Sequence, residues 1–270
     1  MQEATGEKAG MKTDKSDIGQ SQPLVTVIMP AYNAEKYIAA AISSVLSQSY
    51  GELELLVIDD CSSDKSVEIA EGFERMDSRV KVLRNTQNMG VARTRNRGFD
   101  LARGEWIALI DSDDIWHVDK LEKQLERAKE SKAKLLYTSY SLFVDGEKHK
   151  RRYIVPANTN YHSMLKENVI GCSTVMLHKT LTERFRFQYS VYHEDYALWL
   201  EILRNGYDAA GCCEILTDWR ISKTSRSFDK WSAANHRWTI YRKVEKIPLT
   251  KAACVFVAYA FHGLLKHKRV

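Results

Sequence analysis

One stretch, residues 106–116, restricts the possible folds more than any other part of the sequence. It begins as an apolar run, Trp106 to Ile110, whose length is typical of a short buried strand. The run ends in three acids, Asp111, Asp113 and Asp114. Carboxylates crowded at the end of a buried strand repel one another and are costly to desolvate. This arrangement fits an open α/β sheet, in which ligands bind beyond the C-terminal ends of the strands.

The acidic group is suited to a hard divalent cation. Mg²⁺ and Mn²⁺ prefer oxygen ligands, and such a cation offsets the mutual repulsion of the carboxylates. We therefore predict that Asp111, Ser112 and Asp113 form a metal and phosphate site at a strand end. The residues alone leave an alternative open, in which Asp113 or Asp114 caps a helix that begins near His117.

The first half of the chain alternates short apolar runs with segments of helical periodicity. Strands are predicted at 25–29, 53–58, 80–83 and 106–110, and helices at 35–48, 64–75 and 91–102. This order predicts a mainly parallel sheet with right-handed crossovers. Polar residues follow the first, second and fourth strands, so they should meet at one edge, in a nucleotide-sized crevice.

Two common nucleotide-binding signatures are missing from the sequence. No G-x-G-x-x-G follows the first strand, and no G-x-x-x-x-G-K-[ST] occurs. These absences argue against a dinucleotide-dependent dehydrogenase and against a P-loop ATPase. A metal held by carboxylates is therefore expected to bind the phosphates instead.

The second half of the chain is less regular. Strands are predicted at 134–143, 170–177 and 215–219, and helices at 161–167, 193–203, 231–243 and 249–265. Glu194 and Asp195 lie in the first turn of their helix, where the helix dipole favours negative charge. Either both are structural acids at the start of the helix, or one of them acts as a general base. The polar loop 219–227 is either a solvated surface or a set of donors that closes over a diphosphate.

Charge and cysteine content limit the partners. The net charge is +5, but residues 220–270 hold 12 Lys and Arg against 2 Asp and Glu, which suggests an anionic partner, phosphate groups or a lipid surface. Within this segment, helix 249–265 either lies in a membrane interface or docks on the protein core. No RNA-binding signature occurs, so no nucleic-acid partner is predicted. Five cysteines without C-x-x-C spacing favour a reducing compartment.

Five motifs, in this order and spacing, resemble those of family 2 glycosyltransferases of the GT-A fold. They are Val-Thr-Val-Ile-Met-Pro-Ala-Tyr-Asn-Ala-Glu (25–35), Leu-Val-Ile-Asp-Asp-Cys-Ser-Ser-Asp (56–64), Asn-x-Gly-(x)₄-Arg-Asn-x-Gly (88–98), Gly-Glu-Trp-Ile-Ala-Leu-Ile-Asp-Ser-Asp-Asp (104–114) and His-Glu-Asp-Tyr-x-Leu-Trp-Leu (193–200). Each motif alone is weak, but the set is highly specific and covers about Val25 to Trp231. The sequence is most similar in character to bacterial surface-polysaccharide enzymes of the teichuronic-acid and exopolysaccharide type.

The resemblance implies an activity. Such enzymes move a sugar from a nucleotide-sugar donor, most often UDP-linked, to a hydroxyl of a glycan acceptor, generally with inversion. Mn²⁺ or Mg²⁺ would offset the charge of the leaving diphosphate. The acceptor is expected to be linked to a polyprenyl diphosphate. The enzyme would then act at the cytoplasmic face of the bacterial cell membrane, with peripheral contact through its C-terminal segment.

The resemblance also implies roles for individual residues. Those expected to contact the base and ribose are Pro30, Ala31, Tyr32 and Glu35, with Asp60 accepting a hydrogen bond from the base, and Asn88 and Arg95 lining the nucleotide pocket. Asp111 would hold the ribose or sugar side, and Asp113 would coordinate the metal that bridges the diphosphate. Asp195 would be the catalytic base.

One position departs from the family pattern. The family often has an arginine followed two residues later by a histidine, whereas Arg220 is followed by Ser222. The group that caps the diphosphate is therefore open between Arg220 and the later Lys223 or Arg226. Two other functions were weighed. A nucleotidyltransferase is disfavoured because no glycine-rich basic loop follows the first strand, and a catalytically silent nucleotide-sugar-binding protein is disfavoured because the acids are present.

The resemblance also divides the chain into regions. Residues 1–22 are polar, which predicts a mobile arm and no secretory signal. Residues 23–228 form the glycosyltransferase domain, with a nucleotide-binding half at 23–116 and an acceptor-binding half at 117–228. Residues 229–270 form a basic helical segment. No apolar run is long enough to predict a transmembrane helix.

Overall fold

The structure, a computed structural model, describes residues 24–144, 147–221 and 230–268. The strands are β1 (Val25–Ala31), β2 (Leu53–Asp59), β3 (Val80–Arg84), β4 (Trp106–Leu109), β5 (Ile115–Trp116), β6 (Leu135–Val144), β7 (Glu147–Tyr153), β8 (Asn158–Thr159), β9 (Met176–His178) and β10 (Ala209–Arg220). The α-helices are α1 (Ile38–Leu46), α2 (Ser66–Met76), α3 (Val91–Leu101), α4 (Lys120–Ser131), α5 (Tyr161–Lys166), α6 (Lys179–Arg184), α7 (Glu194–Arg204), α8 (Lys230–Thr239) and α9 (Leu249–Lys268). A 3₁₀ turn, η1 (Cys172–Thr174), and a π-helical turn, η2 (Ile240–Val244), complete the order.

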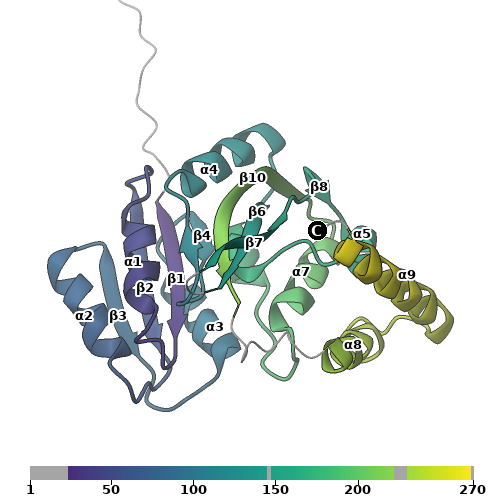
Figure 1. The fold of residues 1–270 in the computed structure, drawn as a ribbon, viewed down its shortest axis with the longest axis horizontal. Helices are drawn as coiled ribbons and strands as arrows, with labels where there is room; N and C mark the ends of the chain where they lie inside the picture. The colour runs from purple at the N-terminus through teal and green to yellow at the C-terminus, as the bar shows by residue number, and fades with distance from the viewer. Residues whose placement is uncertain (1–23, 145–146, 222–229, 269–270) are drawn as a thin grey trace, which may run out of the picture.

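All the described strands belong to one sheet with the order β3-β2-β1-β4-β9-β6-β10-β5, in which β7 also pairs with β6 and β8 with β10 (Figure 1). β1 pairs in parallel with both β2 and β4, and β2 pairs in parallel with β3. The predicted α/β fold with a mainly parallel sheet is therefore confirmed. β2 and β3 follow β1 on one side of the sheet, whereas β4 lies on the other side of β1. In open α/β sheets, ligands bind beyond the C-terminal ends of the strands at such a switch in strand order.

Helices cover both faces of the sheet, because successive residues of a strand point to opposite faces. Val27 of β1 lies in a core cluster with residues of α1, α2 and α4, whereas its neighbour Ile28 lies in the cluster of α3, α6 and α7. Strands that are buried on both faces have continuous apolar sequences. This is why local sequence patterns were sufficient to locate β1, β2 and β4.

The stretch 170–177 differs from its prediction as a single strand. It forms the turn η1 followed by the short strand β9, which pairs antiparallel with β4 and β6. The reason is that hydroxyl side chains compete for backbone groups. Thr174 donates from Oγ1 to the carbonyl of Gly171 at 2.7 Å, which closes a turn in place of an extended strand.

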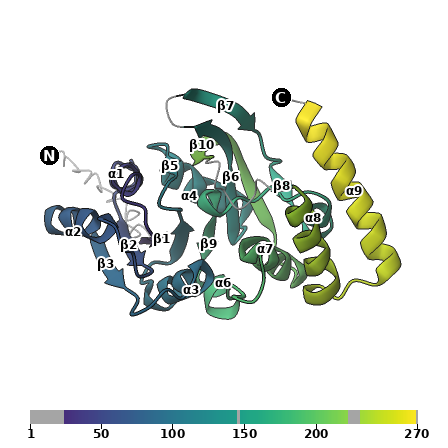
Figure 2. The same ribbon diagram turned by 60° about the horizontal axis from the view of Figure 1, so that its bottom comes forward.

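The C-terminal helices pack together at the end of the molecule opposite α2 (Figure 2). One side of α9 docks on the protein: Ala252 is buried, and the rings of Phe256 and Trp238 lie 5.5 Å apart. Val257 and Phe261 on another side remain exposed. In the described part of the chain, no helix combines the length and the apolar character that crossing a bilayer would require.

Candidate active site

The turn after β4 carries the acids predicted as a metal site. The backbone N–H of Asp114 donates to the carbonyl of Asp111 at 3.1 Å, and the N–H of Asp111 donates to Ser173 Oγ at 2.9 Å. These bonds close the turn and fix it against η1. The alternative in which Asp113 or Asp114 caps the following helix is wrong, because β5 intervenes and the N-cap of α4 is Asp119.

Charge in this turn is poorly compensated. Partial burial and the neighbouring charge of Asp111 raise the pKa of Asp113 to about 6. Burial, followed by the charges of Asp113 and Asp111, raises the pKa of Asp114 well above its usual value. Ser112 lies between the first two acids and is partly exposed. A bound cation would lower the pKa of these acids, because an opposite charge favours the ionised form.

The donor set fits a divalent cation that arrives with a nucleotide. Within the described residues, no three His, Cys, Asp or Glu side chains are grouped so as to hold a metal ion. Asp111 and Asp113 offer hard oxygen donors, which suit Mn²⁺ or Mg²⁺. Two carboxylates supply part of a coordination shell, and such cations commonly take further ligands from substrate phosphates.

A buried arginine joins the end of β4 to the start of α7. Arg95, on α3, donates from Nη2 to Asp111 Oδ1 at 2.6 Å and from Nη1 to Glu194 Oε1 at 2.9 Å. Only 5% of its side chain is exposed. The sequence placed Arg95 in the nucleotide pocket and did not predict this bridge. The sequence held one signal for the bridge, because Arg95, Asp111 and Glu194 lie in three different motifs of the family.

Asp195 follows the bridged glutamate in the first turn of α7. Its Oδ1 accepts the backbone N–H of Tyr196 at 2.7 Å, and the residue stays partly accessible. Burial, followed by the charge of Glu194, raises the pKa of Asp195 to about 6, although Arg95 opposes the shift. A carboxylate with a raised pKa is a better proton acceptor near neutral pH. This raised pKa suits a general base, and that role of Asp195 stays a prediction.

The loops after β1 and β2, which form the predicted nucleotide side of the site, hydrogen-bond to each other. The N–H of Glu35 donates to Asp64 Oδ2 at 3.0 Å, and the N–H of Lys65 donates to Glu35 Oε2 at 3.0 Å. The N–H of Asn33 donates to Ser62 Oγ at 2.9 Å. These reciprocal bonds fix both loops without a ligand.

The residues predicted to bind the nucleotide lie along this edge. Pro30 and Ala31 are buried at the end of β1, while the ring of Tyr32 is 53% exposed beyond it. Asp60 is buried and accepts the backbone N–H groups of residues 89 and 90, each at 2.8 Å. Asn88 is exposed, and its Oδ1 accepts the backbone N–H of residue 90 at 3.2 Å. Contacts of these residues with a base or ribose stay predictions.

Arg220, at the end of β10, is packed against the acid turn. Its Nε donates to the carbonyl of Asp113 at 2.9 Å, and its backbone N–H donates to Asp114 Oδ1 at 2.9 Å. Its guanidinium carbon lies 4.1 Å from the centre of the Tyr37 ring and 4.3 Å from that of Phe143. This positive charge favours the ionised form of Asp113. The other candidates for capping a diphosphate, Lys223 and Arg226, lie outside the described residues, as does Ser222.

Known proteins share both the sequence pattern and the fold. The family model described as Glycosyl transferase family 2 matches residues 26–189. TuaG of Bacillus subtilis (strain 168), a glycosyltransferase named for teichuronic acid biosynthesis, is 38% identical over 246 residues, which cover 91% of this chain and 98% of that protein. WfgD of Escherichia coli is 38% identical over 245 residues, 90% of this chain and 95% of that one. Its name is UDP-Glc:alpha-D-GlcNAc-diphosphoundecaprenol beta-1,3-glucosyltransferase.

Solved structures extend this likeness to the fold. The mannosyltransferase PcManGT from Pyrobaculum calidifontis, solved in complex with GDP-Man and Mn²⁺, matches with a TM-score of 0.69. The match covers 91% of this chain and 71% of that one at 19% sequence identity. At that identity the likeness concerns the fold alone, and it confirms the predicted GT-A architecture.

Proposed function

Because the chain belongs to glycosyl transferase family 2 and is therefore a glycosyltransferase, we propose that it moves a sugar from a UDP-linked donor to a hydroxyl of a lipid-linked glycan. The name of the Escherichia coli relative specifies a UDP-glucose donor and a diphosphoundecaprenol-linked acceptor. The Bacillus subtilis relative is named for the biosynthesis of teichuronic acid. These names support a role in the synthesis of a bacterial surface polysaccharide.

The ion-pair bridge from Asp111 through Arg95 to Glu194 is the observation that carries the mechanism. It fixes the start of α7 against the strand end at which a donor diphosphate would bind. Asp195 adjoins the bridged glutamate, so a base and a phosphate site are held in one place. Positioning of this kind accounts for a large share of enzymatic rate enhancement.

The proposed reaction is a single inverting displacement. Asp195 takes the proton of an acceptor hydroxyl while that oxygen forms a bond to the anomeric carbon of the donor sugar. The bond between the anomeric carbon and the diphosphate oxygen breaks, and the nucleoside diphosphate leaves with the electron pair. Asp111 and Asp113 would hold a divalent cation, which offsets the negative charge of the leaving group. Arg220 contributes a fixed positive charge beside them.

Transfer assays test this proposal directly. UDP-, GDP- and dTDP-sugars would each be incubated with short-chain diphosphate-linked glycan acceptors, with and without Mn²⁺. We expect product from a UDP-sugar when the metal is present, with an anomeric configuration, read by NMR, opposite to that of the donor. No transfer from any donor to any acceptor would contradict the function. A retained configuration would contradict the single displacement.

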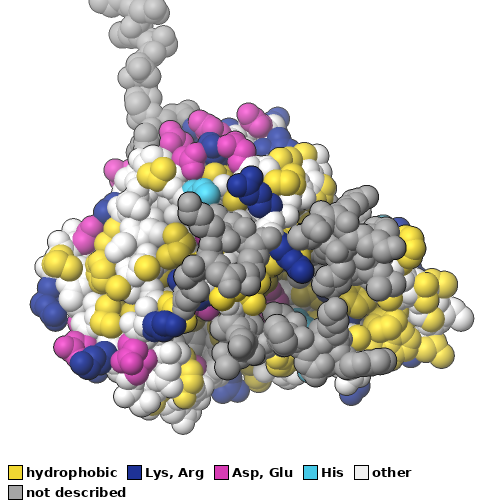
Figure 3. Space-filling model, viewed as in Figure 1, with side chains coloured by type: hydrophobic (Ala, Val, Ile, Leu, Met, Phe, Trp, Pro, Cys, Tyr) yellow, Lys and Arg dark blue, Asp and Glu magenta, His cyan; other side chains and the backbone are white. Residues whose placement is uncertain are grey.

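The same proposal places the enzyme on the cytoplasmic face of the membrane. Its five cysteines are free, as is usual in a reducing compartment. On α9, Leu249, Val257 and Phe261 are between 59% and 68% exposed, and hydrophobic side chains gather at this end of the molecule (Figure 3). The positive charge of residues 220–270 would complement an anionic lipid surface.

Vesicle sedimentation tests the membrane contact. The double substitution Val257→Glu and Phe261→Glu changes exposed residues, so folding should be preserved. We expect the variant to lose sedimentation with anionic vesicles while keeping transfer to a short-chain acceptor. Unchanged sedimentation would show that this face of α9 does not meet lipid.

A further inference from the structure

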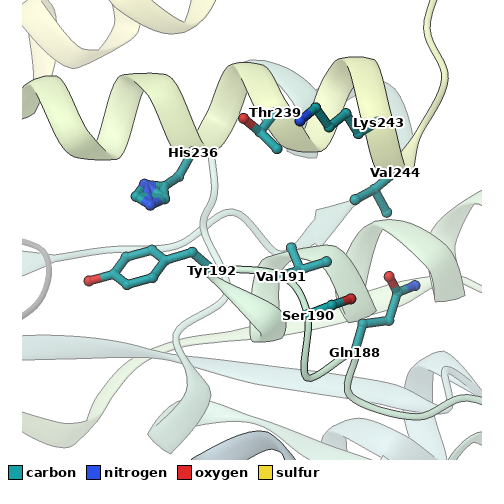
Figure 4. Close-up of a pocket in the computed structure, with 8 residues that line it drawn as sticks. All are labelled: Gln188, Ser190, Val191, Tyr192, His236, Thr239, Lys243 and Val244. Carbon is teal, nitrogen blue, oxygen red and sulfur yellow. The ribbon is translucent and has the colours of Figure 1, made fainter.

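A cavity of about 400 Å³ lies between the loop that precedes α7 and the helical segment formed by α8 and η2 (Figure 4). Its lining residues are Gln188, Ser190, Val191 and Tyr192 from the loop, and His236, Thr239, Lys243 and Val244 from the helical segment. His236, Thr239 and Lys243 are spaced by three and four residues, so they share one face of the helical segment. The volume is within the range of small-ligand sites.

The lining is chemically suited to an anion. It contains the ammonium group of Lys243 and the hydroxyls of Ser190 and Thr239, and Gln188 adds an amide. None of these eight described lining residues is an acid. Phosphate oxygens accept hydrogen bonds from such donors, and charge-assisted bonds of this kind are the strong ones. The site therefore favours a phosphate group over a neutral sugar.

One wall of the cavity lies directly before the proposed catalytic base in the chain. The ring of Tyr192 lies 4.0 Å from that of His236 and 4.9 Å from that of His193. His193 has a φ of 62°, in the left-handed region, and it turns the chain from the cavity wall into α7. Only His193 and Glu194 separate this wall from Asp195 along the chain. A group bound in the cavity would therefore hold a neighbouring sugar beside the base.

We propose that this cavity binds the diphosphate that joins the acceptor glycan to its lipid carrier, with Lys243 as the main charged contact and Ser190 and Thr239 as hydrogen-bond donors. This inference rests on the proposed function, because it assumes a lipid-diphosphate acceptor. The first sugar after the diphosphate would then present its hydroxyl to Asp195. The same helical segment contacts α9 through Trp238 and Phe256, so the anion site and the proposed lipid-facing helix belong to one packed unit.

Calorimetry with a short-chain prenyl diphosphate tests the site without knowledge of the acceptor sugar. Saturating UDP and Mg²⁺ would first occupy the donor site of the full-length protein. We expect Lys243→Gln to weaken binding of the prenyl diphosphate about tenfold, and Lys243→Arg to retain most of it. Lys129→Gln is the matched control, because this exposed lysine lies on α4, outside the cavity lining and the proposed lipid-facing helix. The corresponding prenyl alcohol should bind at least about tenfold more weakly than the diphosphate.

Two results would overturn the assignment. Equal affinity of the wild type and Lys243→Gln for the prenyl diphosphate would show that the cavity is not its site. Equal affinity of the wild type for the prenyl alcohol and the prenyl diphosphate would show that the protein recognises the prenyl chain alone. Lys243 is exposed, so its substitution should leave the melting temperature unchanged. The melting temperature of each variant would be measured as a control for folding.

Steady-state kinetics separate this inference from the proposed function. With an acceptor that the wild type glycosylates, the Lys243→Gln variant should have an acceptor KM about tenfold higher than that of the wild type. Its kcat and its donor KM should be unchanged. Transfer with an unaltered acceptor KM would refute the cavity assignment and leave the function standing. Binding of the diphosphate that depends on Lys243, without transfer to any acceptor, would refute the function alone.

Discussion

The two sides of the candidate site differ in how their polar groups are satisfied. On the nucleotide side, Glu35 and Asp64 are held by reciprocal hydrogen bonds, and the pKa of Asp64 is lowered. On the acid side, Asp111 and Glu194 pair with one buried guanidinium, that of Arg95. Their neighbours Asp113 and Asp195 each have a pKa raised to about 6. The first region is complete in the protein alone. The second carries charge that a ligand or a proton must offset, which is typical of functional sites.

The largest effect expected from this comparison is on catalysis. Asp195→Asn removes the proton acceptor, so kcat should fall about a thousandfold. Because the ionised carboxylate is disfavoured where it lies, the melting temperature should not fall. Glu126→Gln serves as the control, because this exposed acid lies on α4, outside the residues assigned to the site. A loss of less than tenfold for Asp195→Asn, measured by steady-state kinetics, would exclude it as the base.

Removal of the buried guanidinium should give the largest effect on stability. Arg95→Met leaves Asp111 and Glu194 without their partner, and breaking a buried pair in this way costs about 3–5 kcal/mol. Arg84→Met is the control, because both side chains of its pair with Glu71 are exposed, by 58% and 38%, and its loss should be much smaller. Denaturant unfolding measures both. Similar losses for the two variants would remove the distinction between the two regions.

Local patterns were sufficient to predict the parallel half of the fold and the acids at its edge. Each strand signal there is continuous, because β1, β2 and β4 are buried on both faces. The bridge from Arg95 to Glu194 was out of reach, since the two residues are 99 positions apart and no local pattern pairs them. The cavity was also beyond prediction from local patterns, because its walls come from segments that are distant in the chain. The error at 170–177 arose because β-branched residues favour strands, whereas hydroxyl groups there close a turn.

The pH dependence of the acid side should have opposite signs for activity and stability. With a pKa of about 6, Asp195 ionises as the pH rises through that value, so kcat/KM should rise there. The folded protein binds this proton more tightly than the unfolded chain. The resulting contribution to stability is complete below about pH 4 and is lost as the pH rises through about 6. Asp195→Asn should flatten the corresponding part of a plot of unfolding free energy against pH. An unchanged plot would show that another group causes the pH dependence of the unfolding free energy in this range.

The smallest expected effect lies on the nucleotide side and has the opposite sign. Partial burial opposes ionisation of Asp64, but hydrogen bonds from Ser66 and from the N–H of Glu35 outweigh it and lower the pKa. Its contribution to stability is therefore present above the pKa of the unfolded chain and is lost as the pH falls through the folded pKa. Asp64→Ala should cost about 1 kcal/mol at neutral pH, because backbone donors at two loops lose their acceptor. Urea unfolding near pH 7 and again near pH 3 should show this cost shrinking in acid. A cost that grows in acid would mean that Asp64 resembles Asp113 and Asp195, and the contrast between the two sides would then fail.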